Sequence, residues 1–198
     1  MTARTFRARV APLALTTVLL GGVAMATAQP AAAAKAKPSN YYLKFDKNQS
    51  DPTKSRLHLM KKGAKGKADT SVKSWRAGSG NGSKDACRSN AGWLPNGSYD
   101  IEFRSTSYDG SAIKGYVIKL KDKYCAGNKT KRTDLFIHSE MTSKGGQGSK
   151  NGNDSPWRWD GDRDYKSLGC IKLKPTDIKD LFSQANSKGW PKTLKVVS

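Results

Sequence analysis

Short runs in which apolar and polar residues alternate recur along this chain, and they restrict it to a mostly β fold. Tyr99, Ile101 and Phe103 alternate with polar residues after a Pro-Asn-Gly turn signal, which is the pattern of a strand with one buried face. Segments with such short apolar runs, which we predict to be strands, lie at residues 41–45, 56–60, 71–77, 98–104, 115–120, 134–138 and 193–197. Glycine-containing stretches at 61–69 and 78–83 are predicted to be turns and loops between them.

One segment has the periodicity of a helix. Its apolar residues are spaced at i, i+3, i+4 and i+7 and form a single stripe: Ile178, Leu181, Phe182 and Ala185. Thr176 is predicted to cap the start of this helix, and Gly189 and Pro191 end it. The sequence therefore predicts a β-rich α+β domain with one helix near its C-terminus.

The N-terminus has the three regions of a secretory signal. Three arginines precede a nearly continuous run of apolar or small residues from 10 to 26, and small-residue cleavage sites follow. The run is short of the about 20 residues that a spanning helix needs, so a cleaved leader is favoured over a membrane anchor. We expect a leader at 1–34, a linker at 35–40 and one domain at 41–198, secreted and without a transmembrane segment in the mature chain.

Basic residues far outnumber acidic ones. Without residues 1–34 the chain has 33 Lys and Arg against 16 Asp and Glu, a formal charge of +17. This balance favours a polyanionic neighbour, which can be nucleic acid, an acidic membrane surface or an anionic cell-wall polymer. Lysines also cover surfaces simply for solubility. Because nucleic acid is the least accessible of the three to an exported protein, we expect none and favour the wall polymer.

The three cysteines leave one thiol without an intramolecular partner. Cys170 lies in a turn-like Ser-Leu-Gly-Cys sequence that suits a free thiol. Export favours a disulfide between the other two, Cys87 and Cys125. The alternative is that Cys170 pairs with one of them, because sequence cannot decide the connectivity among three cysteines.

A cysteine and a histidine brought together from distant positions are the minimum for thiol acyl-transfer chemistry. Cys170 would be the nucleophile, and His138, which ends an apolar run, would lower the pKa of the thiol and take its proton. Ser139 follows as a possible hydrogen-bonding partner of that imidazole. The alternatives are a structural cysteine in a strand and a histidine placed for packing.

The residues beside the cysteine also have a chemical role in this interpretation. Gly169 lets backbone N–H groups approach a substrate carbonyl, where they can stabilise an oxyanion, and Ser167 shapes the same site. Lys172 can orient a substrate carboxylate. These three residues are the predicted substrate-binding group.

The stretch 144–164 has no periodicity; it has four glycines early, between 145 and 152, and then two tryptophans, Trp157 and Trp159. A loop of this length in a small domain is often a functional lid or binding loop. Its acidic end, 160–164, lacks the glycine and the final acid of a calcium-binding loop, so we interpret it as a solvated acidic turn. We expect no metal and no cofactor.

From residue 136 to 197 the chain resembles the catalytic core of the L,D-transpeptidase family, bacterial enzymes that cross-link peptidoglycan stem peptides. The segments 137–139 and 167–172, followed by the helix and the last strand, occur in the order of that family. Residues 93–99 resemble its Thr-Pro-x-Gly-x-Tyr segment. The resemblance implies a mixed β-sandwich with one C-terminal helix packed on the sheet. It also implies a thioester on Cys170, formed with His138 as the base.

Three departures from the family pattern bear on the reaction. Leu168 replaces the family's histidine two residues before the cysteine, Lys172 replaces its arginine, and 31 residues separate His138 from Cys170. Related secreted enzymes of this fold without that histidine also hydrolyse peptide bonds. We therefore expect an exported acyl-transferase acting on peptidoglycan stem peptides. The alternatives are an L,D-carboxypeptidase or endopeptidase of the same fold and a non-catalytic basic protein that binds anionic wall polymer.

Overall fold

The computed structural model describes residues 39–128 and 130–198 of the chain. The leader predicted at 1–34 lies outside the described residues, as does the linker predicted at 35–40 apart from its last two positions. In the described part of the chain, no helix is both long enough and apolar enough to cross a membrane.

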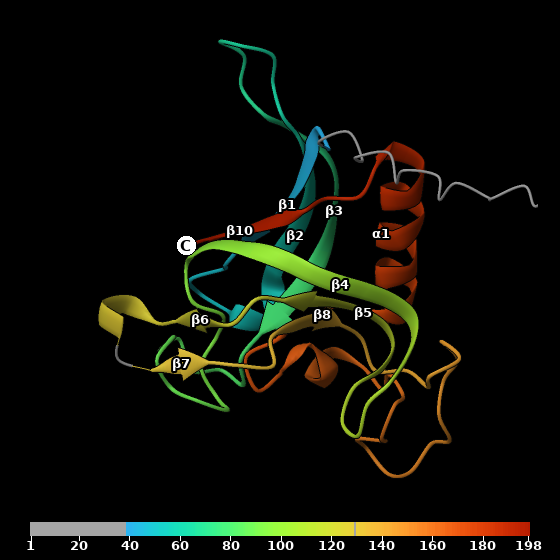
Figure 1. Cartoon of the computed structure of the whole chain (residues 1–198). Helices are drawn as coiled ribbons and strands as arrows, with labels where there is room; N and C mark the ends of the chain where they lie inside the picture. Colours follow the sequence, from blue (N-terminus) through green and yellow to red (C-terminus); the bar gives the residue numbers. More distant parts are fainter. Residues whose placement is uncertain (1–38, 129) are drawn as a thin grey trace, which may run out of the picture. The chain divides into compact units, whose positions relative to one another are not determined.

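Within the described residues, eight strands join edge to edge in one closed sheet, in the order β1-β10-β4-β5-β8-β9-β3-β2 (Figure 1). These strands are β1 (Tyr41–Asp46), β2 (Ser55–Lys61), β3 (Thr70–Ser79), β4 (Gly97–Asp109), β5 (Lys114–Leu120), β8 (Phe136–His138), β9 (Ile171–Lys172) and β10 (Thr193–Val197). Two pairs, β1 with β10 and β8 with β9, are parallel. The mostly β class is confirmed, and the main sheet is mixed and closed on itself.

The sheet and the helix α1 (Pro175–Lys188) enclose the apolar core. The predicted stripe of Ile178, Leu181, Phe182 and Ala185 is the buried face of α1. Thr176 is not the cap: Lys174 is the N-cap residue and Pro175 takes the first helical position. Proline suits that position because its φ is already helical and its missing N–H would have no partner there.

A small hairpin and a disulfide lie outside the main sheet. β6 (Lys123–Tyr124) pairs with β7 (Lys131–Arg132), and η2 (Ala126–Asn128) belongs to their connection. The other short helices are η1 (Pro52–Lys54) and η3 (Asp162–Tyr165). The structure joins Cys87 to Cys125, directly after β6, and leaves Cys170 as a free thiol.

The parallel pairing of β8 with β9 brings together the two ends of the predicted catalytic motif. His138 lies opposite Lys172, and Ile137 lies opposite Ile171. Side chains alternate along a strand, so Cys170 faces the same side as Lys172 and His138, while both isoleucines face the core. A parallel pair needs a long crossover, and the stretch 139–170 supplies it.

Candidate active site

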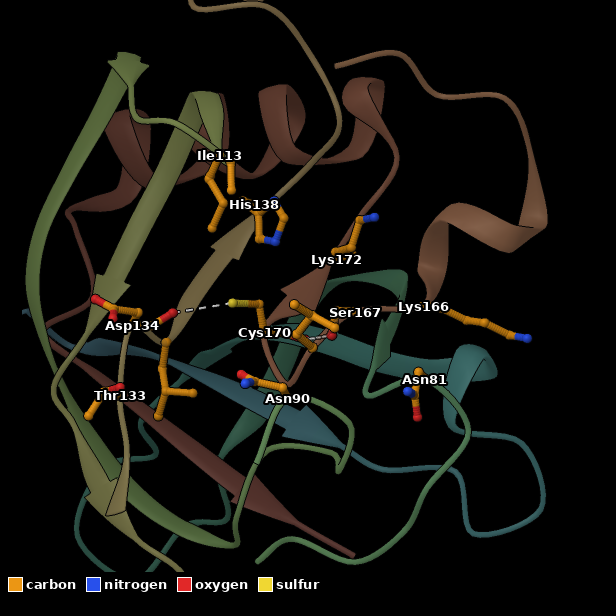
Figure 2. Close-up of a pocket in the computed structure, with 13 residues that line it drawn as sticks. Asn81, Asn90, Ile113, Thr133, Asp134, His138, Lys166, Ser167, Cys170 and Lys172 are labelled. Atoms are coloured by element: carbon orange, nitrogen blue, oxygen red, sulfur yellow. Dashed lines mark hydrogen bonds between the residues drawn. The ribbon is translucent and has the colours of Figure 1, made fainter. Parts of the chain in front are cut away.

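A pocket of about 440 Å³ lies on the outer face of the sheet at β8 and β9 (Figure 2). Cys170 and His138 both line it, as do Ser167 and Lys172. Its other lining residues include the apolar side chains of Ala112, Ile113, Leu135 and Leu168. The structure thus brings the predicted nucleophile and the predicted base into one partly apolar pocket.

The orientation of His138 is set by a backbone group. The His138 Nδ1–H donates to the carbonyl oxygen of Ser139, 3.1 Å away. A carbonyl can only accept, so the proton is on Nδ1 and Nε2 is the basic nitrogen. The hydroxyl of Ser139 is buried and has no hydrogen-bond partner within the described residues. Ser139 therefore orients the imidazole through its backbone carbonyl, and its hydroxyl does not contact the imidazole through a hydrogen bond.

Burial keeps the thiol and the imidazole neutral. Burial first, and then the positive charge of Lys172, lower the pKa of His138 to about 3. Cys170 is partly exposed, yet it loses enough solvent that burial raises the pKa of its thiol to about 11. That rise is opposed by a backbone hydrogen bond from Phe136 and then by the positive charges of Lys172, Lys119 and Arg132. The resting pair is therefore thiol and imidazole, and a neutral imidazole is the form that can accept a proton as a general base.

The thiol has a backbone partner in this structure. Cys170 Sγ donates to the carbonyl oxygen of Asp134 at 3.4 Å (Figure 2). Asp134 has a φ of 52°, in the left-handed region that residues other than glycine seldom occupy. The thiol proton must leave this contact before His138 can accept it.

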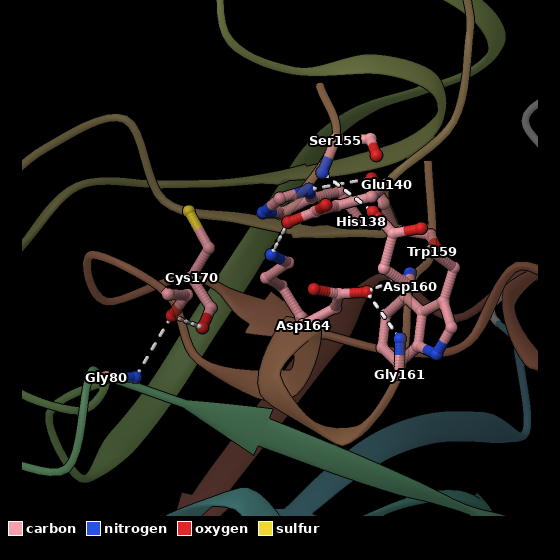
Figure 3. Close-up of polar contacts among 12 residues, drawn as sticks. Gly80, His138, Glu140, Ser155, Trp159, Asp160, Gly161, Asp164 and Cys170 are labelled. Atoms are coloured by element: carbon pink, nitrogen blue, oxygen red, sulfur yellow. Dashed lines mark hydrogen bonds and ion pairs between the residues drawn. The ribbon is translucent and has the colours of Figure 1, made fainter. Parts of the chain in front are cut away.

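The turn before Cys170 is fixed by side-chain hydroxyls. Ser167 Oγ accepts from the N–H of Gly169 at 3.1 Å and from that of Gly80 at 3.0 Å, and it donates to the Cys170 carbonyl at 2.7 Å (Figure 3). Ser79 Oγ donates to the Gly169 carbonyl at 3.2 Å. The Ser167 hydroxyl, predicted to bind substrate, is thus fully used in shaping the turn.

Two backbone N–H groups of this turn are available to a substrate. Within residues 39–128 and 130–198, neither the Leu168 N–H nor the Cys170 N–H has a hydrogen-bond partner. Groups of this kind beside a nucleophile can stabilise an oxyanion. Gly169 between them has a φ of 130°, which favours glycine, and so the predicted role of Gly169 agrees with its geometry.

Lys172 forms an ion pair that could not be predicted from the sequence. Its side chain is buried, and its ammonium forms an ion pair with Glu140. The pKa of Glu140 is raised, mainly by burial. Lys172 lines the pocket, but the contact predicted with a substrate carboxylate would have to compete with this ion pair.

Acidic side chains of the stretch 144–164 form hydrogen bonds with backbone N–H groups of the same stretch. Asp164 is buried and accepts from the backbone N–H groups of Asp160 and Gly161, and Asp160 accepts from the N–H of Ser155 (Figure 3). The interpretation as a solvated acidic turn is therefore wrong for Asp164, because backbone N–H groups replace water around its carboxylate. Trp159 packs edge-on against Tyr165, with ring centroids 4.8 Å apart.

One group of carboxylates in the described part of the chain has the spacing to hold a cation. Single oxygens of Glu140, Asp154 and Asp164 lie within 4.8 Å of one another. Lys172 already places a positive charge against Glu140, and backbone N–H groups occupy Asp164.

Sequence reasoning missed Arg132, Asp134 and Glu140. Arg132 and Glu140 look like ordinary charged surface residues in the sequence, because nothing local separates a buried charge from a solvated one. Asp134 acts through its carbonyl, which no side-chain pattern reports.

One of three comparisons with known proteins shows the family of this chain. A comparison with curated proteins found no match. A solved structure titled "Structure of Bdellovibrio bacteriovorus Bd1075" is similar at 14% identity and a TM-score of 0.47, over 81% of this chain and 48% of that one. This chain thus spans about half the length of that protein. The model of the L,D-transpeptidase catalytic domain, YkuD, matches residues 40–197, a range that contains both His138 and Cys170. The chain therefore belongs to the L,D-transpeptidase catalytic domain family.

Proposed function

We propose that this protein is an exported cysteine acyl-transferase that acts on the stem peptides of peptidoglycan. The observation that carries the proposal is the shared pocket of Cys170 and His138, in which the Ser139 carbonyl directs Nε2 of the imidazole to act as the base. Membership of the family supports this chemistry. The strongly basic composition supports a setting among anionic wall polymers.

The first half of the reaction forms a thioester. Cys170 Sγ attacks a peptide carbonyl while His138 Nε2 takes the thiol proton. The negative charge on the carbonyl oxygen is stabilised by the N–H groups of Leu168 and Cys170. The C–N bond then breaks, His138 returns the proton to the leaving amine, and the acyl group stays on Cys170 as a thioester.

The second half transfers the acyl group. The amine of another stem peptide attacks the thioester carbonyl, and His138 takes a proton from that amine and returns it to the departing Cys170 sulfur. A new peptide bond forms, the C–S bond breaks, and the enzyme regains its thiol. No redox partner is required at either step.

Hydrolysis of the same thioester is the second candidate. Leu168 stands at the family's histidine position, and its side chain lines the pocket while it is 66% exposed to solvent. Water can therefore reach the acyl group. With water as the acceptor the protein would act as an L,D-carboxypeptidase or endopeptidase.

The deciding experiment is mass spectrometry of disaccharide-peptide fragments incubated with the protein freed of residues 1–34. Cys170→Ala is the inactive variant, and Ser183→Ala, on the exposed face of α1, is the matched control. Cross-linked dimers that require Cys170 identify a transpeptidase, and shortened peptides alone identify a hydrolase. If neither appears, the acyl-transfer proposal fails, and a protein that only binds the anionic wall polymer becomes the better account.

A further inference from the structure

Arg132 is a buried cation without a carboxylate partner in the described part of the chain. Its side chain, at the end of β7, is only 3% exposed. The guanidinium instead donates to four backbone carbonyls. The acceptors and distances are Ala86 (2.6 Å), Gly92 (3.1 Å), Leu168 (3.3 Å) and Trp93 (3.4 Å). Burying a charge without an opposite charge beside it costs free energy, so an arginine at this position indicates a role beyond filling space.

One of these carbonyls belongs to the turn that carries the nucleophile. In a trans peptide the carbonyl and the following N–H point in opposite directions. Arg132 holds the Leu168 carbonyl, and Ser167 Oγ holds the N–H of Gly169 on the other side of the same peptide. The peptide plane before Gly169 is thus held from both sides.

Gly169 shows how closely the guanidinium approaches this turn. A Cβ atom built on Gly169 would lie 2.0 Å from Arg132 Nη2, a distance that real atoms do not share. The glycine therefore serves two purposes, since it permits the positive φ and leaves room for the arginine. The close approach also places an unpaired positive charge behind Cys170.

The remaining contacts anchor Arg132 to the disulfide loop. Ala86 precedes Cys87, and the Cys87–Cys125 disulfide ties that loop to the hairpin on which Arg132 lies. Gly92 and Trp93 come from the same loop. The guanidinium therefore has a rigid support on one side and the nucleophile turn on the other.

We propose that Arg132 is a positioning residue for acyl transfer. It fixes the Leu168–Gly169 peptide, so that the free N–H groups beside Cys170 are aligned for the oxyanion. Its unpaired charge also stabilises the negative charge that develops on the sulfur and the carbonyl oxygen. This proposal rests on the acyl-transfer function proposed above, and its first test below needs no substrate.

The first test is the pH dependence of Cys170 alkylation by iodoacetamide in the folded protein. Arg132→Met removes a positive charge near the thiol, so the pKa of the Cys170 thiol rises and less reactive thiolate is present at about pH 8. Each remaining thiolate is more nucleophilic, which compensates in part, so we expect alkylation to be about three- to tenfold slower. Lys131→Met, which removes an exposed charge from the same strand, should leave the rate unchanged. A folded Arg132→Met variant with the wild-type profile would overturn the electrostatic part.

The second test uses Arg132→Lys, which keeps the charge but cannot bridge four carbonyls. We expect near-wild-type alkylation and an unchanged KM on stem-peptide fragments, with kcat reduced about tenfold or more because the oxyanion donors are misaligned. A kcat equal to that of the wild type would refute the positioning role. If Arg132→Lys unfolds, the arginine supports the whole domain, and a role specific to the nucleophile turn is likewise refuted.

The two proposals can fail separately. The alkylation rate measures how Arg132 affects the reactivity of the Cys170 thiol, and it does not depend on the substrate. If wild-type protein leaves stem peptides unchanged while Arg132→Met still slows alkylation, the substrate assignment is wrong and the role of Arg132 stands.

Discussion

At the scale of single residues, the site is a neutral pair held by backbone carbonyls. His138 donates to Ser139, and the Cys170 thiol donates to Asp134. Burial is the main cause of both pKa shifts, and it favours the uncharged form of each group. At neutral pH the imidazole is therefore uncharged and able to accept a proton, and the thiol keeps its proton.

The lowered pKa of His138 makes the stability of the protein depend on pH. The pKa is about 3 in the folded protein and about 6.5 in an unfolded chain. Between these values the unfolded chain binds more protons, so the free energy of unfolding falls as the pH drops, by up to about 1.4 kcal/mol per unit. Urea unfolding of wild type and His138→Gln at about pH 7 and about pH 4.5 measures this. A difference between the two proteins that is the same at both pH values would contradict the buried neutral imidazole.

The unused hydroxyl of Ser139 gives a second prediction at this scale. Ser139→Ala should keep kcat and KM within about twofold of wild type, because the carbonyl that orients His138 remains. The melting temperature should be equal or slightly higher, since an unpartnered buried hydroxyl costs about 1–3 kcal/mol. Steady-state kinetics and thermal unfolding test both parts. A large fall in kcat with the fold intact would show that the hydroxyl takes part after all.

At the scale of elements, the parallel neighbours β8 and β9 form the site and α1 supports the sheet behind it. The isoleucines of β8 and β9 belong to the same core cluster as the buried residues of α1, so the helix packs behind the strands that carry the pocket. A substitution that weakens the packing under these strands should therefore also disturb the positions of the pocket residues.

Leu181 tests this packing because it is fully buried on the inner face of α1. Leu181→Ala should lower the free energy of unfolding by about 2–5 kcal/mol, through lost burial and the cavity it leaves. Ser183→Ala, on the exposed face of the same helix, should change it by less than about 0.5 kcal/mol. Denaturant unfolding monitored by circular dichroism compares them. Equal effects of the two substitutions would show that α1 does not pack as described.

At the scale of the whole molecule, the main sheet closes on itself, and one disulfide ties the loop of Cys87 to the separate β6–β7 hairpin. The sheet joins β1 to β10, which come from opposite ends of the domain. The disulfide links Cys87 to Cys125 across 38 residues of sequence. These long-range connections hold the loop and the hairpin that support the nucleophile turn.

The disulfide contributes to stability by restricting the unfolded chain. For a separation of 38 residues the chain-entropy relation gives about 4 kcal/mol. The double variant Cys87→Ser/Cys125→Ser should lose about that much in denaturant unfolding and should show lower kcat, because the anchor of Arg132 is loosened. Wild-type stability under reducing conditions would argue against a structural role for the bond.

The sequence alone determined the features that depend on local periodicity and residue type. The alternating strands and the buried face of α1 follow from side-chain spacing. The chemistry of a thiol beside an imidazole predicted Cys170 and His138 as a pair, and their catalytic role stays a prediction. Only the tertiary structure decided that His138 bonds to the Ser139 carbonyl, that Lys172 is paired with Glu140 and that Arg132 donates to the Leu168 carbonyl. The physical reason is that the partner of a buried polar group is set by contacts between segments far apart in the chain, and residue type alone does not distinguish a buried charge from an exposed one.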